Sequence, residues 1–149
     1  MLMVSEVKQS HEIANELRPV LLRIARELRR EIHSLGVSGG QVTVLETIKR
    51  RPGITAARIA ELERISAPAV SNHLARMEKA NLIQRTRGDV DRRQVGLALT
   101  PEGEKVLRSV RQRRTAWLAA RLDKLDQAER AAVEQAIGPL EKLLGADEA

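Results

Sequence analysis

The stretch SAPAVSNHLARMEKANLIQRTRGDVDRRQVGLALT, residues 66–100, decides the fold of this chain. It opens as a helix, because Ser66 suits the N-cap position and Pro68 stands in the first turn, where proline is tolerated. Asn81 stands where a helix needs a left-handed closing residue. One face of this helix is apolar, with Val70, Leu74 and Met77. The other face holds Pro68, Asn72, Ala75, Arg76 and Lys79, with Ser71 at its edge.

The second half of the stretch predicts a β-hairpin. Residues 82–87 suit a strand, residues 88–92 suit a turn, and apolar residues then alternate at Val95, Leu97 and Leu99, so that one face is expected to be buried. The hairpin tip is strongly charged, with Asp89, Asp91, Arg92 and Arg93.

A further short helix precedes the stretch. Thr55 is a suitable cap for a helix from Ala56 to about Arg64, and Ile54 before it suits a very short strand. Two short helices joined by so tight a link form a helix-turn-helix. With the hairpin that follows, residues 38–100 are expected to form a winged helix-turn-helix.

Helices are expected on both sides of this lobe. Apolar spacings of three and four predict one helix over 12–35, with Gly36 as its end. Pro19 within it either kinks the helix or moves its start to about Arg18. Ser38 caps a helix that ends at the Pro-Gly pair of residues 52–53.

The C-terminal part also reads as helical. Thr100 and Pro101 begin a long helix, and Asp126 with Glu129 forms a capping box for a last one. The fold class predicted is therefore mainly α with a small β-hairpin wing.

The charge of the chain is uneven. Residues 51–122 carry 15 basic and 7 acidic side chains, whereas residues 123–149 carry 3 and 7. A basic middle section indicates either a surface that binds a polyanion or a merely solvated arginine-rich face. There is no cysteine, which excludes disulfides and thiolate metal sites, and the single aromatic residue, a tryptophan, leaves no platform for base stacking.

The element order over about residues 12–144 resembles the MarR family of bacterial transcription regulators. The specific match is Asp91-Arg92-Arg93 followed by Leu99-Thr100 and Gly103, which is similar to that family's D-x-R…L-T-x-x-G pattern. The run VSNHLARMEKANLI is similar to its recognition helix and closing turn. Asn81 departs from the glycine that members commonly have there, a mild change because Asn tolerates the same backbone.

The resemblance implies a single MarR-type domain over 1–149, with dimerisation helices at 12–35 and 101–146 and a DNA-binding lobe at 38–100. It implies a homodimer that binds double-stranded DNA at an inverted repeat, with half-sites roughly 10 base pairs apart. It further implies a repressor that a small, phenolic or anionic aromatic ligand releases. The ligand pocket would lie between the dimerisation helices and the DNA-binding lobe.

Candidate DNA contacts follow from these positions. On and before the recognition helix they are Thr55, Ser66, Pro68, Ser71, Asn72 and Arg76. In the wing, the family pattern places Arg93 in the minor groove, where a narrow A·T-rich groove attracts arginine. Asp91 is expected to orient or pair with an arginine. Phosphate contacts are expected from Arg85, Arg87 and Arg92.

Several of these residues have other interpretations. Arg76 could instead pair with Asp89 or Asp91, and the arginines between Arg108 and Arg114 suit an interface or solvated surface better than a DNA contact. Trp117 suits core or dimer packing better than an effector pocket. The alternative functions are a winged-helix module that binds another protein and a non-specific, architectural DNA-binding protein.

Other function classes find no support in the sequence. His11, His33 and His73 are scattered without carboxylates at ligand spacing, so neither a metal site nor a cofactor is expected. No nucleophile–base motif or phosphate loop is present, so we do not expect an enzyme. The first residues lack the features of a signal peptide and no apolar run is long enough to span a bilayer, so we expect a cytoplasmic protein without a membrane partner.

Overall fold

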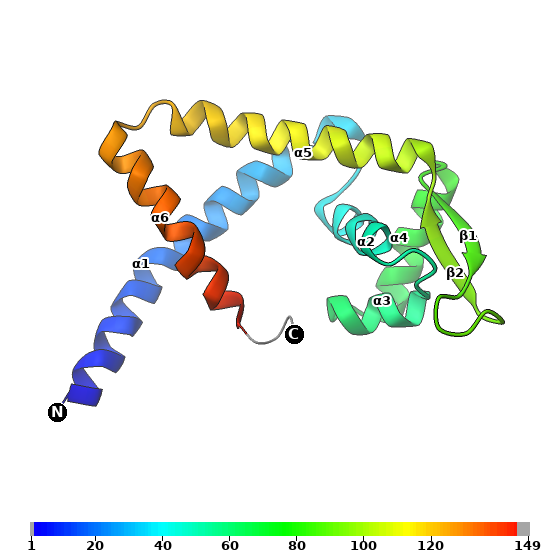
Figure 1. Ribbon diagram of the computed structural model, residues 1–149, viewed down its shortest axis with the longest axis horizontal. Helices are drawn as coiled ribbons and strands as arrows, with labels where there is room; N and C mark the ends of the chain where they lie inside the picture. The colour runs from blue at the N-terminus through cyan, green and yellow to red at the C-terminus, as the bar shows by residue number, and fades with distance from the viewer. Residues whose placement is uncertain (1, 146–149) are drawn as a thin grey trace. The chain divides into compact units, whose positions relative to one another are not determined.

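The computed structural model describes residues 2–145, and the side chains of residues 9–145 (Figure 1). Two compact units divide the chain, one up to Arg113 and one from Arg114 onward. The elements in chain order are α1 (Leu2–Arg30), a 3-10 turn η1 (His33–Leu35), α2 (Gly39–Arg50), α3 (Ala56–Glu63), α4 (Ala67–Lys79), β1 (Ile83–Arg87), β2 (Val95–Leu99), α5 (Pro101–Leu122) and α6 (Gln127–Leu144). Within residues 2–145, each helix is too short or too polar to span a lipid bilayer.

The first unit is built around one aliphatic core. In residues 38–100, which we call the winged lobe, α2 packs against α3, α4 and β2, and α3 packs against α4. The core also takes in Ile32 before α2 and Leu107 and Val110 from α5. Its other buried members are Val37, Val42, Val44, Leu45, Ile48, Ile54, Ile59, Val70, Leu74, Met77, Leu82, Ile83 and Leu97.

The first helix differs from the prediction at both ends. It begins at Leu2 and runs through Pro19, so a start at about Arg18 was wrong. Pro19 is exposed, and water can therefore satisfy the carbonyl that the missing N–H leaves unpaired. The helix ends at Arg30 rather than at Leu35. Gly36 is left-handed as expected, with φ 77°, but it closes the 3-10 turn, where its amide donates to the His33 carbonyl at 3.2 Å.

The predicted helix caps are confirmed. Ser38 Oγ accepts from the Gln41 amide at 3.2 Å while Gln41 Oε1 accepts from the Ser38 amide at 3.1 Å, which completes a capping box at α2. Asp126 and Glu129 form the same reciprocal pair at α6. These local contacts start each helix within a residue of the predicted position.

Two residues with positive φ end helical segments in the winged lobe. Arg64, φ 53°, closes α3 and makes the tight link to α4, so a non-glycine residue occupies a conformation that costs free energy. Asn81, φ 61°, closes the segment after α4, as the sequence predicted. The chain then turns directly into β1.

The wing is an antiparallel hairpin of two strands, with Ile83 opposite Leu99 and Arg87 opposite Val95. Ile54 adds the expected short strand, because it forms a bridge with Leu97. The prediction of one continuous buried face is wrong at Val95, which is 51% exposed. This residue lies at the tip end of the hairpin, where the strand pairing continues but the apolar core does not.

A clamp around Thr100 joins the wing to α5. The Thr100 hydroxyl donates to the Asn81 carbonyl at 2.6 Å and accepts from the Gly103 amide at 3.0 Å. Gly103 passes so close to the Leu82 carbonyl that an added Cβ would stand 2.1 Å from its oxygen. The L-T-x-x-G part of the pattern therefore has a structural role: it holds the base of the wing against the first turn of α5.

The second unit contains the end of α5 and all of α6. None of the residues of α6 is buried in the single chain. Val133, Ile137, Leu143 and Leu144 of this helix are 45–69% exposed. A helix with so much exposed aliphatic surface normally packs against a partner.

Candidate nucleic-acid interface

The outer face of α4 is fully presented to solvent. Val70, Leu74 and Met77 point into the core and hold the helix on α2 and β1. The opposite face, in which every residue is exposed, consists of Pro68, Ser71, Asn72, Ala75, Arg76 and Lys79. The short Ala75 and Ser71 allow close approach, and Asn72 and Arg76 supply groups that hydrogen-bond to base edges and phosphates.

Thr55 and Ser66 both cap helices. Thr55 Oγ1 accepts from the Arg58 amide and Ser66 Oγ accepts from the Ala69 amide, each at 3.2 Å. Each hydroxyl keeps its proton free to donate outward. The start of a helix also carries partial positive charge, so both positions are suited to a phosphate.

The wing tip is organised by a carboxylate and an arginine. Asp91 accepts three hydrogen bonds from Arg93: from its backbone amide at 3.0 Å and from Nε and Nη2 at 3.1 Å each. The side-chain bonds, followed by the backbone bond, lower the pKa of the Asp91 carboxyl from its ordinary value of 3.8. The Arg93 side chain is nevertheless 91% exposed. The Arg93 guanidinium is therefore held in one direction while it stays accessible to a partner.

The remaining wing arginines differ from one another. Arg85 Nε lies 2.9 Å from Glu78 Oε1 of α4, although the N–H is not aligned with that oxygen as in a hydrogen bond. Arg85 therefore ties the wing to α4, a contact that sequence reasoning missed. Arg87 and Arg92 are exposed and have no carboxylate partner within ion-pair distance among the described residues.

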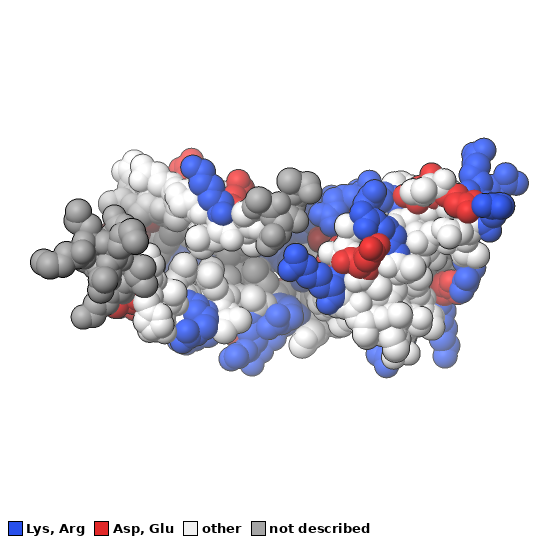
Figure 2. Space-filling view, turned by 90° about the horizontal axis from the view of Figure 1, so that it is seen from below, with Lys and Arg blue, Asp and Glu red and all other residues white. Residues whose placement is uncertain are grey.

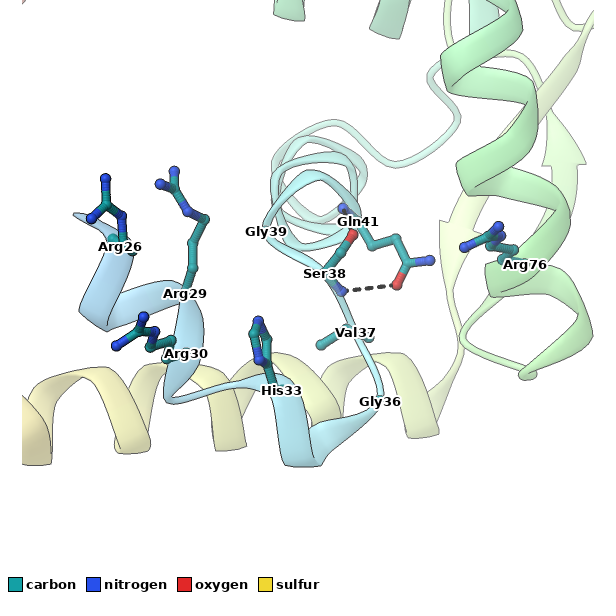
Figure 3. Close-up of a pocket in the computed structure, with 10 residues that line it drawn as sticks. All are labelled: Arg26, Arg29, Arg30, His33, Gly36, Val37, Ser38, Gly39, Gln41 and Arg76. Carbon is teal, nitrogen blue, oxygen red and sulfur yellow. Dashed lines mark hydrogen bonds between the residues drawn. The ribbon is translucent and has the colours of Figure 1, made fainter. Parts of the chain in front are cut away.

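Arg76 does not form the alternative pair. Neither Asp89 nor Asp91 lies within ion-pair distance of it in the part of the chain described here. It lines a cavity of about 610 Å³ together with residues from the end of α1 and the start of α2 (Figure 3). Three arginines of α1, which sequence reasoning missed, line the same cavity: Arg26, Arg29 and Arg30. Their i, i+3, i+4 spacing, which puts them on one helix face, was the available signal.

The other singled-out residues make contacts inside the chain. Arg113 donates to the Ser34 hydroxyl. Trp117 is half-buried and lies under the Arg121 guanidinium, whose carbon is 3.9 Å from the ring centroid. Within the described residues, no group of His, Asp or Glu could hold a metal ion.

Basic side chains gather at the wing end of the first unit. Figure 2 shows Lys and Arg projecting there, at the right of the view, next to a few acidic side chains. The exposed face of α4, the caps of α3 and α4 and the Arg-tipped wing all belong to the winged lobe. This combination of a polar helix and a basic hairpin suits a duplex, with the helix in one groove and the hairpin beside it.

Comparison with known proteins agrees with this geometry. The MarR family model matches residues 37–95. The HTH-type transcriptional repressor MdtR of Bacillus subtilis (strain 168) is 31% identical over 118 residues, which are 79% of this chain and 76% of MdtR. The crystal structure of the YusO protein from Bacillus subtilis is 30% identical and has a TM-score of 0.70, covering 93% of this chain and 96% of that one. This chain belongs to the MarR family.

The family assignment confirms the predicted family and the predicted fold class. MarR proteins are winged helix-turn-helix transcription regulators rather than enzymes. A third structure, Streptococcus pneumoniae FabT in complex with DNA, is 21% identical with a TM-score of 0.67, covering 87% of this chain and 96% of FabT. At that identity the likeness concerns the fold.

Proposed function

We propose that this MarR-family regulator is a repressor that binds an inverted repeat as a homodimer and is released by a small molecule. The observation that carries the proposal is the pairing of the exposed polar face of α4 with an Arg93 side chain that Asp91 holds in place. Such pre-orientation reduces the entropy lost when a flexible side chain binds. The structure of FabT in complex with DNA supports DNA as the partner of this fold.

Each candidate residue then has a defined role. Ser71, Asn72 and Arg76 contact base edges and nearby phosphates in the major groove, because the short residues around them let α4 approach. Thr55 and Ser66 hold phosphates at the helix starts. Arg93 enters the minor groove, and Arg87 and Arg92 add sequence-independent affinity. Arg85 contributes mainly by holding the wing on Glu78.

Dimerisation is supported by exposed apolar surface on the helices outside the winged lobe. On α1, Ile13, Val20, Leu21, Leu22 and Ile24 are 37–56% exposed. On α6, Ile137, Leu143 and Leu144 are 53–69% exposed. A second copy of the chain would bury these side chains and place two winged lobes about a two-fold axis, which matches a two-fold symmetric DNA site.

A mobility-shift titration against the gene's own upstream region tests this function. We expect saturable binding to an inverted repeat, with a preference of at least about 10³ over unrelated duplexes. Equally weak binding to every duplex, with a steep salt dependence, would instead indicate non-specific DNA coating. No binding to any duplex would favour the protein-interaction module.

Two single variants sharpen the test. Arg93→Ala should weaken specific binding severely, by about 2 kcal/mol or roughly thirtyfold, because it removes an oriented charged donor. Lys79→Ala is the matched control: it also removes one exposed positive charge, at the end of α4, and it should have only a mild effect. Equal losses from both variants would contradict the role assigned to the wing.

A further inference from the structure

The cavity between the end of α1, the start of α2 and α4 has an unusual charge. Four arginines line it: Arg26, Arg29 and Arg30 from α1 and Arg76 from α4 (Figure 3). Arg30 is paired with Glu27 at 3.1 Å. The other three have no carboxylate within ion-pair distance among the described residues. A concave site with several uncompensated guanidinium groups attracts an anion.

The start of α2 adds neutral donors to the same cavity. Ser38 and Gly39 line it, and the Gly39 amide has no acceptor among the described residues. The Arg29 stem lies on this helix start, because a Cβ added to Gly39 would stand 3.2 Å from Arg29 Cδ. Free amides at a helix start bind anions with favourable dipole orientation.

A side-chain amide also lines the cavity. Gln41 is only 8% exposed, and its Oε1 is used by the Ser38 amide. Its side-chain nitrogen donates to none of the described residues and is turned toward the side on which Arg76 lies (Figure 3). The nitrogen itself is accessible rather than enclosed, so it can donate to a group bound in the cavity.

We propose that this cavity binds a small molecule that carries a phosphate or pyrophosphate group, and that this ligand and DNA compete for Arg76. Guanidinium forks match phosphate oxygens in a bidentate way, and a multiply charged group uses several of them at once. The residues lining the cavity include no Phe, Tyr or Trp, and His33 supplies the one ring among them. A volume of about 610 Å³ leaves room for an organic part beyond the phosphate.

Competition follows from the position of Arg76. This residue belongs to the exposed face of α4 and to the lining of the cavity. Its guanidinium cannot serve a phosphate in the cavity and a DNA group at the same time. Occupancy of the cavity therefore removes one DNA contact without requiring a large movement of the lobe. This inference rests on the proposed function and names the ligand class that would release the DNA.

Calorimetry without DNA tests the binding site itself. Titration of pyrophosphate into the full-length chain, at constant ionic strength and without divalent cations, should give saturable binding of about one ion per chain. Arg26→Gln and Arg29→Gln should each lower the affinity about tenfold or more, as expected for a lost charge-assisted hydrogen bond. Arg23→Gln, an exposed arginine of α1 outside the cavity, is the matched control and should change it less than twofold.

Two results of this titration would overturn the proposal. One is the absence of saturable binding of pyrophosphate to the wild type. The other is an equal loss in Arg23→Gln, which would indicate diffuse attraction to a basic helix. In a separate titration, tighter binding of benzoate than of pyrophosphate would also overturn it, because the site would then select an aromatic carboxylate. Thermal unfolding of each variant checks that the fold is kept.

A mobility-shift experiment tests the competition. Pyrophosphate should release DNA from the wild type and from Arg23→Gln but, at the same concentration, not from Arg29→Gln. If Arg29→Gln weakens DNA binding as much as Arg93→Ala does, the α1 arginines contact the DNA backbone and the proposal fails. The two failures are distinguishable, because the calorimetry does not depend on DNA and the proposed regulator function does not depend on pyrophosphate.

Discussion

Replacing Gly103 by alanine is expected to destabilise the winged lobe by roughly 2–4 kcal/mol. The new Cβ would stand 2.1 Å from the Leu82 carbonyl oxygen and 3.1 Å from its carbon, which are backbone atoms and cannot turn aside. The first turn of α5 must therefore move away from the base of the wing. That movement strains both hydrogen bonds of the Thr100 hydroxyl, at 2.6 and 3.0 Å.

The magnitude combines three effects. Overpacking costs about 1–3 kcal/mol, and two weakened hydrogen bonds cost about 1 kcal/mol each. Alanine regains up to about 1 kcal/mol through its better helix propensity. The loss therefore exceeds the gain, even though alanine is the better helix former.

Urea unfolding of the wild type and of Gly103→Ala measures the difference in their free energies of unfolding. Both proteins are compared at one concentration, because the chain is expected to dimerise. Gly138→Ala is the matched control: apart from its chain neighbours and the nearby backbone of its own helix, nothing lies within 4 Å of a Cβ added there, so its effect should stay below about 1 kcal/mol. A Gly103→Ala protein whose midpoint equals that of the wild type would refute the role assigned to this close approach.

Three further predictions follow from particular residues. Arg64→Gly should stabilise the fold by about 0.5–1 kcal/mol, because glycine adopts φ 53° without strain; an unchanged or lower unfolding midpoint would count against it. In an NMR titration, Arg93→Ala should return the pKa of Asp91 to near its ordinary value of 3.8. Because that pKa is lowered in the folded state, the Asp91–Arg93 pairing contributes to stability above pH 3.8 and is lost as the pH falls through the lowered value. Between pH 6 and 8 Asp91 stays ionised, so its titration should leave DNA binding unaffected. Deletion from Asp126 onward should yield a monomer or an unfolded chain, and a stable, dimeric truncation in sedimentation analysis would contradict the role given to α6.

Short-range features of the fold were predictable from the sequence. The caps at Ser38, Thr55, Ser66 and Asp126 were predicted correctly, because a cap depends on residues only three positions apart. The left-handed Asn81 was also predicted, since few residue types tolerate that backbone. Local chemistry was sufficient in these places because no distant contact opposes it.

Errors arose where neighbours in space decide the outcome. The end of α1 was placed at Leu35 because the apolar spacing continues, whereas the chain leaves the helix at Arg30 so that Ile32 enters the core. Val95 fits the alternation of a half-buried strand but lies beyond the core that would cover it. Periodicity shows which residues share a face and does not show how far the covering layer extends.

By itself, the sequence determined the order of the elements, the polar face of α4 and the Asp91–Arg93 wing, because each depends on a short pattern of residue types. Only the tertiary structure decided which charges meet. It paired Arg85 with Glu78. It also left Arg76 unpaired with Asp89 or Asp91 and placed Arg76 in one cavity with arginines of α1. The physical reason is that long side chains carry no preference for one distant partner. Their contacts are set by the packing of the aliphatic core beneath them.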